Sequence, residues 1–251
     1  MDHKNKFMFM IGFRFVLALS LFLGSGCVTV YNPATQRNEM YFISEDSELA
    51  MGKKLADEVI KENKLIEDNT VVSALLQVAH EIARVCDRSN LTYHFYVIDN
   101  EEMNAFALPG GYIFVHKGLF DKVSRDELAF VLAHEIGHVS ARHSVKRLQA
   151  AMGVNLLLNL AFGNNAQSMQ QALGIVYNVV SKGYSRQDEY LADTLAVKYT
   201  HRAGFDPYAG VSLMEKLQKE GAQGHPFVFL NSHPKSSDRI ANIQDKILQI
   251  R

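Results

Sequence analysis

The sequence predicts an α+β fold that is mainly helical, with a small sheet of about three strands. Two observations support this prediction. Apolar residues recur at helical spacing over most of the 251 residues, whereas residues 91–116 are rich in β-branched and aromatic side chains. The composition, 47% hydrophobic and 21% charged, is typical of a globular chain. A net charge of −1 gives no electrostatic reason to expect a nucleic-acid partner.

The first 26 residues have the layout of a signal peptide. Basic residues, the last of them Arg14, precede or interrupt an apolar run that ends at Cys27. The apolar part after Arg14 is too short for a comfortable membrane span. Residues 24–27 resemble a bacterial lipobox, so we expect Cys27 to carry lipid and residues 27–43 to form an extended, irregular tether. Plain cleavage after a small residue and an uncleaved anchor are the alternatives.

Residues 44–251 are then expected to form one domain. Its N-terminal part predicts two helices, Ser44–Asn63 and Asn69–Asp87, followed by a strand, Leu91–Asp99, and a hairpin, Asn104–His116. The turn of the hairpin is expected at Pro109-Gly110-Gly111. Cys86 lies among apolar residues and is interpreted as a small core residue rather than a metal ligand.

The stretch Ser124–Gln149 predicts a long helix. Ser124 and Glu127 have the spacing of a capping box, and the apolar residues that follow recur at helical spacing. The apolar residues 150–181 predict two further helices separated near Gly163, which could pack on the core, cover the site as a lid or touch the membrane. Three more helices are predicted at Ser185–Ala203, from Asp206-Pro207 onward, and after His233-Pro234.

The long helix contains the sequence HEIGH, with His134 and His138 four residues apart and Glu135 beside them. Residues at this spacing lie on one face of a helix, so both imidazoles can bind one ion. This is the H-E-x-x-H pattern, in which two histidines bind zinc and the glutamate acts as general base. The alternative, two ordinary histidines, is less favourable because polar side chains inside an apolar stripe are costly without a role.

Zinc bound in this way needs a third protein ligand. His143 is predicted to point away from His138 on a continuous helix and is interpreted as a surface residue. Glu189, on the helix Ser185–Ala203, is the better candidate, and Asp193 one turn later can orient a ligand imidazole. Asp188 is expected to cap that helix, and His201 and His80 are expected at the surface.

Three motifs of this chain occur together in one family: HEIGH, the upstream NAFALPGGYIFV, and the downstream Glu189-x-x-x-Asp193. The chain resembles the gluzincin metallopeptidases of the CAAX prenyl protease and HtpX type, closest to the BepA and LoiP type of periplasmic lipoproteins. The resemblance runs from about Ser44 to the C-terminus. It implies a zincin-like domain with one zinc ion per chain, held by His134, His138 and Glu189, with Glu135 catalytic.

The resemblance also implies that a histidine in the loop before the last helix approaches the zinc. Here that residue is His233, followed by Arg239. His233 is either a fourth ligand that silences the enzyme, a transition-state donor, or a residue that makes only a turn contact. Arg239 is expected behind the ligands together with Asp193, and it could also assist in the transition state. The residue after the lipidated cysteine is Val28. By resemblance to enterobacterial lipoproteins, the lack of Asp at this position implies the inner leaflet of the outer membrane.

The expected activity is hydrolysis of peptide bonds. A zinc ion lowers the pKa of a water molecule to about 7, and Glu135 takes its proton as it attacks the scissile carbonyl. The edge strand Asn104–Ala107 could pair with an extended substrate. Misfolded outer-membrane proteins are the expected substrates at the level of the family. A chaperone or assembly factor with a closed, silent zinc site, and a lipid-anchored scaffold without metal, are the alternatives.

Overall fold

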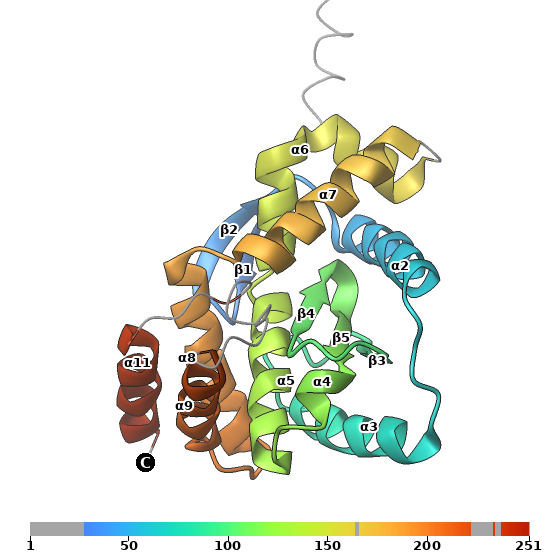
Figure 1. Ribbon diagram of the computed structural model, residues 1–251. Coiled ribbons are helices and arrows are strands. Elements are labelled where there is room, and N and C mark those ends of the chain that lie inside the picture. Colours follow the sequence, from blue (N-terminus) through green and yellow to red (C-terminus); the bar gives the residue numbers. More distant parts are fainter. Residues whose placement is uncertain (1–27, 164–165, 222–232, 234–236, 251) are drawn as a thin grey trace, which may run out of the picture.

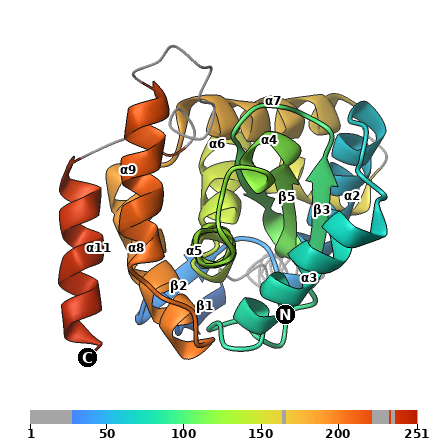
Figure 2. The same cartoon turned by 60° about the horizontal axis from the view of Figure 1, so that its bottom comes forward.

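The computed structural model describes residues 28–163, 166–221, 233 and 237–250 (Figure 1). The predicted signal peptide and Cys27 lie outside the described residues. Helix α5 (Arg125–Ser140) lies at the centre, with a small sheet on one side and helices α8 and α11 on the other (Figures 1 and 2). The predicted α+β fold, mainly helical with a small sheet, is confirmed.

Residues 28–41 form a β-hairpin, so the prediction of an irregular tether is wrong. Strand β1 (Val28–Asn32) pairs antiparallel with β2 (Arg37–Tyr41). The Asn32 side chain explains the order of this segment: its Oδ1 accepts from the Ala34 N–H within the turn, and its Nδ2 donates to the Ser140 carbonyl of α5. The turn signal at Asn32-Pro33 in the sequence marks the turn of this hairpin.

Two helices follow close to their predicted bounds. Helix α2 (Glu45–Glu62) begins at Ser44, whose side chain accepts from the Ser47 N–H. Helix α3 (Asn69–Ala83) begins at Asp68, whose side chain accepts from two backbone N–H groups. Such caps satisfy the N–H groups that the first turn of a helix leaves unpaired.

A three-stranded sheet is formed by β3 (His94–Ile98), β4 (Ala105–Leu108) and β5 (Tyr112–His116) in the order β3-β5-β4. Strand β5 is central, parallel to β3 and antiparallel to β4. The predicted hairpin is therefore β4–β5, and its turn is the short 3-10 helix η2 (Pro109–Gly111). Gly110 and Gly111 have φ values of 75° and 88°, which favour glycine. Strand β4 is left as an edge of this sheet.

The predicted helix Ser124–Gln149 is in fact two helices. Helix α5 ends at Ser140, and Arg142 has a left-handed backbone with φ 56°. The Arg142 guanidinium explains this break, because it lies 2.7 Å from Glu48 and stacks over the Tyr41 ring at 3.8 Å. Helix α6 (His143–Phe162) then starts in a new direction. The short helix α4 (Lys117–Phe120) lies before α5 in the chain.

Helix α7 (Ala166–Lys182) completes the pair of helices predicted for residues 150–181. Among the described side chains, α6 and α7 bury apolar residues against α2, including Leu148, Met152 and Leu173. This packing favours a core role for the segment over the alternatives. No helix in the described part of the chain is long and apolar enough to cross a membrane.

The C-terminal third contains helices α8 (Arg186–Arg202), α9 (Ala209–Gly221) and α11 (Ser237–Gln249). Helices α8 and α9 pack on α5, and α11 packs on α8 and α9. Figure 2 shows the three helices side by side at one edge of the molecule. The main core lies between α5 and its neighbours α3, α8 and α9 and the sheet. Cys86 is buried in this core, as predicted, and is a free thiol.

Candidate metal centre

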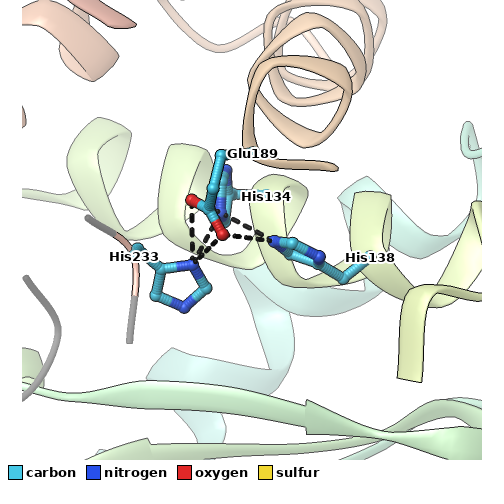
Figure 3. A group of neighbouring side chains, drawn as sticks. All are labelled: His134, His138, Glu189 and His233. Carbon is cyan, nitrogen blue, oxygen red and sulfur yellow. Dashed lines mark hydrogen bonds and ion pairs between the residues drawn. The ribbon is translucent and has the colours of Figure 1, made fainter. Parts of the chain in front are cut away.

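Two helices cross closely to build the centre. Helix α5 contributes His134 and His138, and α8 contributes Glu189 (Figure 3). Glu135 also lies on α5. Gly137 allows this approach, because a Cβ there would stand 3.2 Å from the carbonyl oxygen of Ala192 on α8. The neighbouring backbone is therefore the reason for glycine inside the HEIGH sequence.

Four side chains converge in this buried space: His134, His138, Glu189 and His233, with one potential ligand atom each and all four atoms within 4.8 Å of one another. The Nε2 atom of His134 is 3.1 Å from Nε2 of His138 and 3.1 Å from Nδ1 of His233. Nδ1 of His233 is also 3.1 Å from a Glu189 oxygen. Three imidazole nitrogens and one carboxylate oxygen give four donor atoms, and a tetrahedral zinc ion binds four such ligands.

The electrostatics of the cluster favour a cation. Burial lowers the pKa of His233, but the carboxylates of Glu189 and Glu135 outweigh burial and raise the pKa to about 10. Burial also raises the pKa of Glu189, while the charge of His233 and hydrogen bonds from the imidazoles hold it well below its usual range. The site thus stabilises a positive charge among its donor atoms, and the residues present fit a divalent metal.

Partners behind the ligands hold them in place. Oδ1 of Asp193 lies 3.0 Å from Nδ1 of His134, the ring nitrogen that faces away from the cluster. Arg239, on α11, donates to both oxygens of Asp193 at 2.7 and 2.8 Å, and its Nη1 is 3.0 Å from Glu189. Arg239 is therefore engaged with two carboxylates behind the ligands, which does not support the expected help in a transition state.

Glu135 is buried beside the cluster, on the side of His233. Its Oε1 lies 3.2 Å from Nε2 of His233. Burial raises the pKa of Glu135, but the charges of His233 and the two other histidines bring it below its usual value. The carboxylate is therefore ionised and able to accept a proton.

The prediction that His143 lies at the surface is wrong. The residue is only 3% exposed, and its Nδ1 is 2.8 Å from Nδ1 of His138. On a continuous helix the two residues would be separated by about 140°, but the left-handed residue Arg142 turns α6 so that His143 faces His138. Burial lowers the pKa of His143 well below its usual value, so the imidazole is neutral.

Tyr184 is a second neighbour of His138 that the sequence did not reveal. The two rings are stacked with their centroids 4.1 Å apart, and the Tyr184 hydroxyl is 2.7 Å from the Ser144 hydroxyl. Tyr184 precedes the cap of α8, a position that carries no sequence signal for a site. The other predictions for this region hold: Asp188 forms the capping box of α8 with Ser185, and His201 and His80 are exposed.

The edge strand β4 lies against α5 near the centre. The His116 N–H donates to the Asn104 carbonyl, so the backbone of Asn104 faces β5, and alternation directs the backbone groups of Ala105 and Ala107 to the free edge. The Ala107 carbonyl accepts a hydrogen bond from Ser144, which is consistent with this direction. The Phe106 side chain is half-buried and stacks on Phe114, which is fully buried.

The fold and the buried donor set are those of a zincin-like metallopeptidase. The family model described as "Peptidase family M48" matches residues 72–247, and the chain belongs to that family. The resemblance inferred from the three sequence motifs is therefore confirmed at the level of the family.

Named relatives agree with this assignment. The chain is 31% identical over 220 residues to the mitochondrial metalloendopeptidase OMA1 of Schizosaccharomyces pombe, covering 86% of this chain and 65% of the relative. It is 28% identical over 227 residues to the beta-barrel assembly-enhancing protease of Escherichia coli K12, and the match covers 83% of this chain and 45% of the relative. It is 30% identical to the metalloprotease LoiP of the same organism, covering 69% of each. The chain therefore spans less than two thirds of the first two relatives.

Proposed function

We propose that this protein is a zinc-dependent endopeptidase that hydrolyses misfolded or misassembled proteins of the cell envelope. The observation that carries the proposal is the convergence of His134, His138 and Glu189 with the ionised carboxylate of Glu135 beside them. The relative named the beta-barrel assembly-enhancing protease supports the choice of substrates.

The residues that would hold the zinc ion are His134, His138 and Glu189, with His233 as a fourth. When bound, zinc supplies an electrophile for the scissile carbonyl and lowers the pKa of a water molecule. Glu135 then accepts the proton of the attacking water and delivers it to the leaving amine. Asp193 holds His134 in the tautomer that directs Nε2 into the cluster, since its carboxylate faces Nδ1 at 3.0 Å.

The free edge of β4 is the proposed binding surface for an extended substrate. Asn104 and Phe106 pair inward with β5, while Ala105 and Ala107 direct their backbone groups outward. The Ala107 carbonyl already accepts from Ser144, so a substrate would pair with the backbone of Ala105. A peptide that adds to this edge gains main-chain hydrogen bonds without a requirement for particular side chains. This mode suits an enzyme that acts on unfolded segments of many proteins.

His233 closes the site in this arrangement. It faces Glu189 through Nδ1 and Glu135 through Nε2, at 3.1 and 3.2 Å, and so fills the space between the general base and the other ligands. We therefore choose the role of fourth ligand over that of transition-state donor. Cleavage requires His233 to move away and admit water and substrate.

The decisive experiment compares Glu135→Gln with wild type in casein cleavage and zinc content. The variant is expected to keep about one zinc ion per chain and lose cleavage, because the amide cannot accept the proton. Glu67→Gln, an exposed glutamate on the loop before α3, is the matched control and should cleave as wild type does. Full cleavage by Glu135→Gln contradicts the assignment of the base.

The second candidate function is a chaperone or assembly factor with a permanently closed site, and the position of His233 is the observation that favours it. His233→Ala separates the two. An endopeptidase that His233 restrains should cleave casein faster once this ligand is lost. If neither wild type nor His233→Ala cleaves any unfolded protein while both retain zinc, the chaperone role is supported.

We also propose that lipid on Cys27 anchors the chain to the inner leaflet of the outer membrane, with the catalytic domain in the periplasm. The sequence of residues 24–27 supports the lipid, and the similarity to the beta-barrel assembly-enhancing protease supports the location. Cys27→Ser should release the processed protein from the membrane fraction. If the processed variant still sediments with membranes, the lipid anchor is excluded.

A further inference from the structure

Both histidines of the HEIGH sequence have a partner on the ring nitrogen that faces away from the cluster. For His134 that partner is the Asp193 carboxylate. For His138 it is a third imidazole, with Nδ1 of His143 at 2.8 Å from Nδ1 of His138. On its other side, His143 presents Nε2 to Oδ1 of Asp188 at 3.4 Å. The row of side chains runs from the cluster through His138 and His143 to the first turn of α8.

The order of these atoms determines where the protons lie. Nε2 of His138 points into the cluster, 3.1 Å from Nε2 of His134, and is the ligand atom. A neutral imidazole that binds metal through Nε2 carries its hydrogen on Nδ1. The His138 Nδ1–H therefore donates to Nδ1 of His143, which must be unprotonated at that atom. His143 then carries its own hydrogen on Nε2, the atom that faces the Asp188 carboxylate.

We propose that His143 is a positioning residue of the metal centre, which fixes the tautomer and the ring orientation of His138 and is itself oriented by Asp188. The proposal rests on the metal site of the proposed function and adds a residue to it. His143 touches neither substrate nor metal. It acts through His138, as Asp193 acts through His134. The helix break at Arg142 makes the contact between His143 and His138 possible.

A purely structural role for His143 would predict different behaviour. His143 also lies near Tyr184, with ring centroids 5.9 Å apart, and a packing role would be served by any ring of similar size. Hydrogen bonding to His138 requires an acceptor atom. Two substitutions separate these requirements: His143→Phe keeps a ring and removes the acceptor, and His143→Gln keeps an acceptor on a side chain of comparable length.

The test measures the zinc dissociation constant of the purified full chain against a chromophoric chelator, together with the visible spectrum of the cobalt-substituted protein. His143→Phe is expected to weaken zinc binding by about 10- to 100-fold and to shift the cobalt spectrum, as is typical for loss of a partner behind a ligand. His143→Gln should restore most of the affinity. His116→Phe, a substitution of another buried histidine outside the site, is the matched control and should bind zinc as wild type does.

Three results would overturn the proposal: wild-type affinity and spectrum in His143→Phe, an equal loss in His116→Phe, or an equal loss in His143→Gln. A wild-type protein without stoichiometric zinc contradicts the proposed function instead, so the two failures are distinguishable. Nitrogen-15 NMR of the zinc-loaded wild type needs no variant to fold. It should show His138 protonated at Nδ1 and His143 at Nε2, and a His143 protonated at Nδ1 excludes the proposal.

Discussion

Arg239 binds Asp193 through two hydrogen bonds, from Nε at 2.8 Å and from Nη2 at 2.7 Å, and both side chains are fully buried. The pair joins the last helix, α11, to α8, and Asp193 continues to His134. The C-terminal helix is thereby connected to the metal centre by charge as well as by packing. Burial raises the pKa of Asp193, and Arg239 outweighs it and keeps the carboxylate ionised.

Arg239→Met is expected to destabilise the metal-free protein by roughly 3–5 kcal/mol, because it removes the guanidinium that compensates the charge of two buried carboxylates, Asp193 and Glu189. Urea unfolding with a chelator present measures this loss. Zinc should recover part of the stability, since its charge compensates Glu189. Arg202→Met is the control, because Arg202 is half-exposed and lies 3.8 Å from Asp87. Equal losses in the two variants would show that the buried pair has no special weight.

Zinc itself should stabilise the folded chain. A ligand that binds only the folded state at a hundred times its dissociation constant adds about 2.7 kcal/mol. The midpoint temperature of thermal unfolding is expected to rise with zinc concentration in wild type and to be independent of zinc in His134→Ala. The exposed His201→Ala should follow wild type. A zinc-dependent rise that persists in His134→Ala would place the binding site elsewhere.

Gly52→Ala should destabilise the domain by about 1–3 kcal/mol through overpacking. A Cβ at this position of α2 would stand 2.0 Å from the carbonyl oxygen of Pro109, in the turn of the β4–β5 hairpin. Gly174→Ala on α7 is the matched control, because among the described residues no atom beyond its own helix backbone lies within 4 Å of its Cβ position. That variant should gain about 1 kcal/mol of helix propensity. Chemical denaturation of both variants checks the contrast, and a neutral Gly52→Ala would mean that α2 is not held against the turn.

The buried His116 predicts a loss of stability in mild acid. Burial lowers its pKa to about 4, whereas in the unfolded chain it is 6.5. Between these values the unfolded state binds a proton that the folded state does not, so stability falls as pH decreases from 6.5 to 4. At pH 5 the expected loss in the free energy of unfolding is roughly 1–2 kcal/mol. Glu102, 3.8 Å from Nδ1 of His116, reduces this loss because its charge favours the protonated imidazole.

His116→Phe removes this titration. Its free energy of unfolding is expected to depend less on pH between 7 and 5 than that of wild type, both measured without metal. The other histidines contribute equally to the two proteins, so the difference isolates His116. Identical slopes would show that His116 titrates normally in the folded protein.

Local patterns determined most of the fold and the first half of the site. The caps at Ser44, Ser124 and Ser185 predicted where three helices begin, and the periodic apolar residues predicted that they are helices. The two glycines after Pro109 predicted the hairpin turn. His134 and His138 are four residues apart on one helix, so their common direction follows from helix geometry alone.

The tertiary structure decided the rest, because it depends on contacts between residues far apart in the chain. Arg142 adopts a left-handed backbone because its guanidinium meets Glu48 and Tyr41, and no local pattern announces that partnership. The break turned His143 from an expected surface residue into a partner of His138. Asn32 likewise joined the N-terminal hairpin to α5. The sequence by itself determined that two histidines share one helix face with a glutamate beside them. Folding decided which distant side chains complete that face, since only packing brings α8 and the loop of His233 to it.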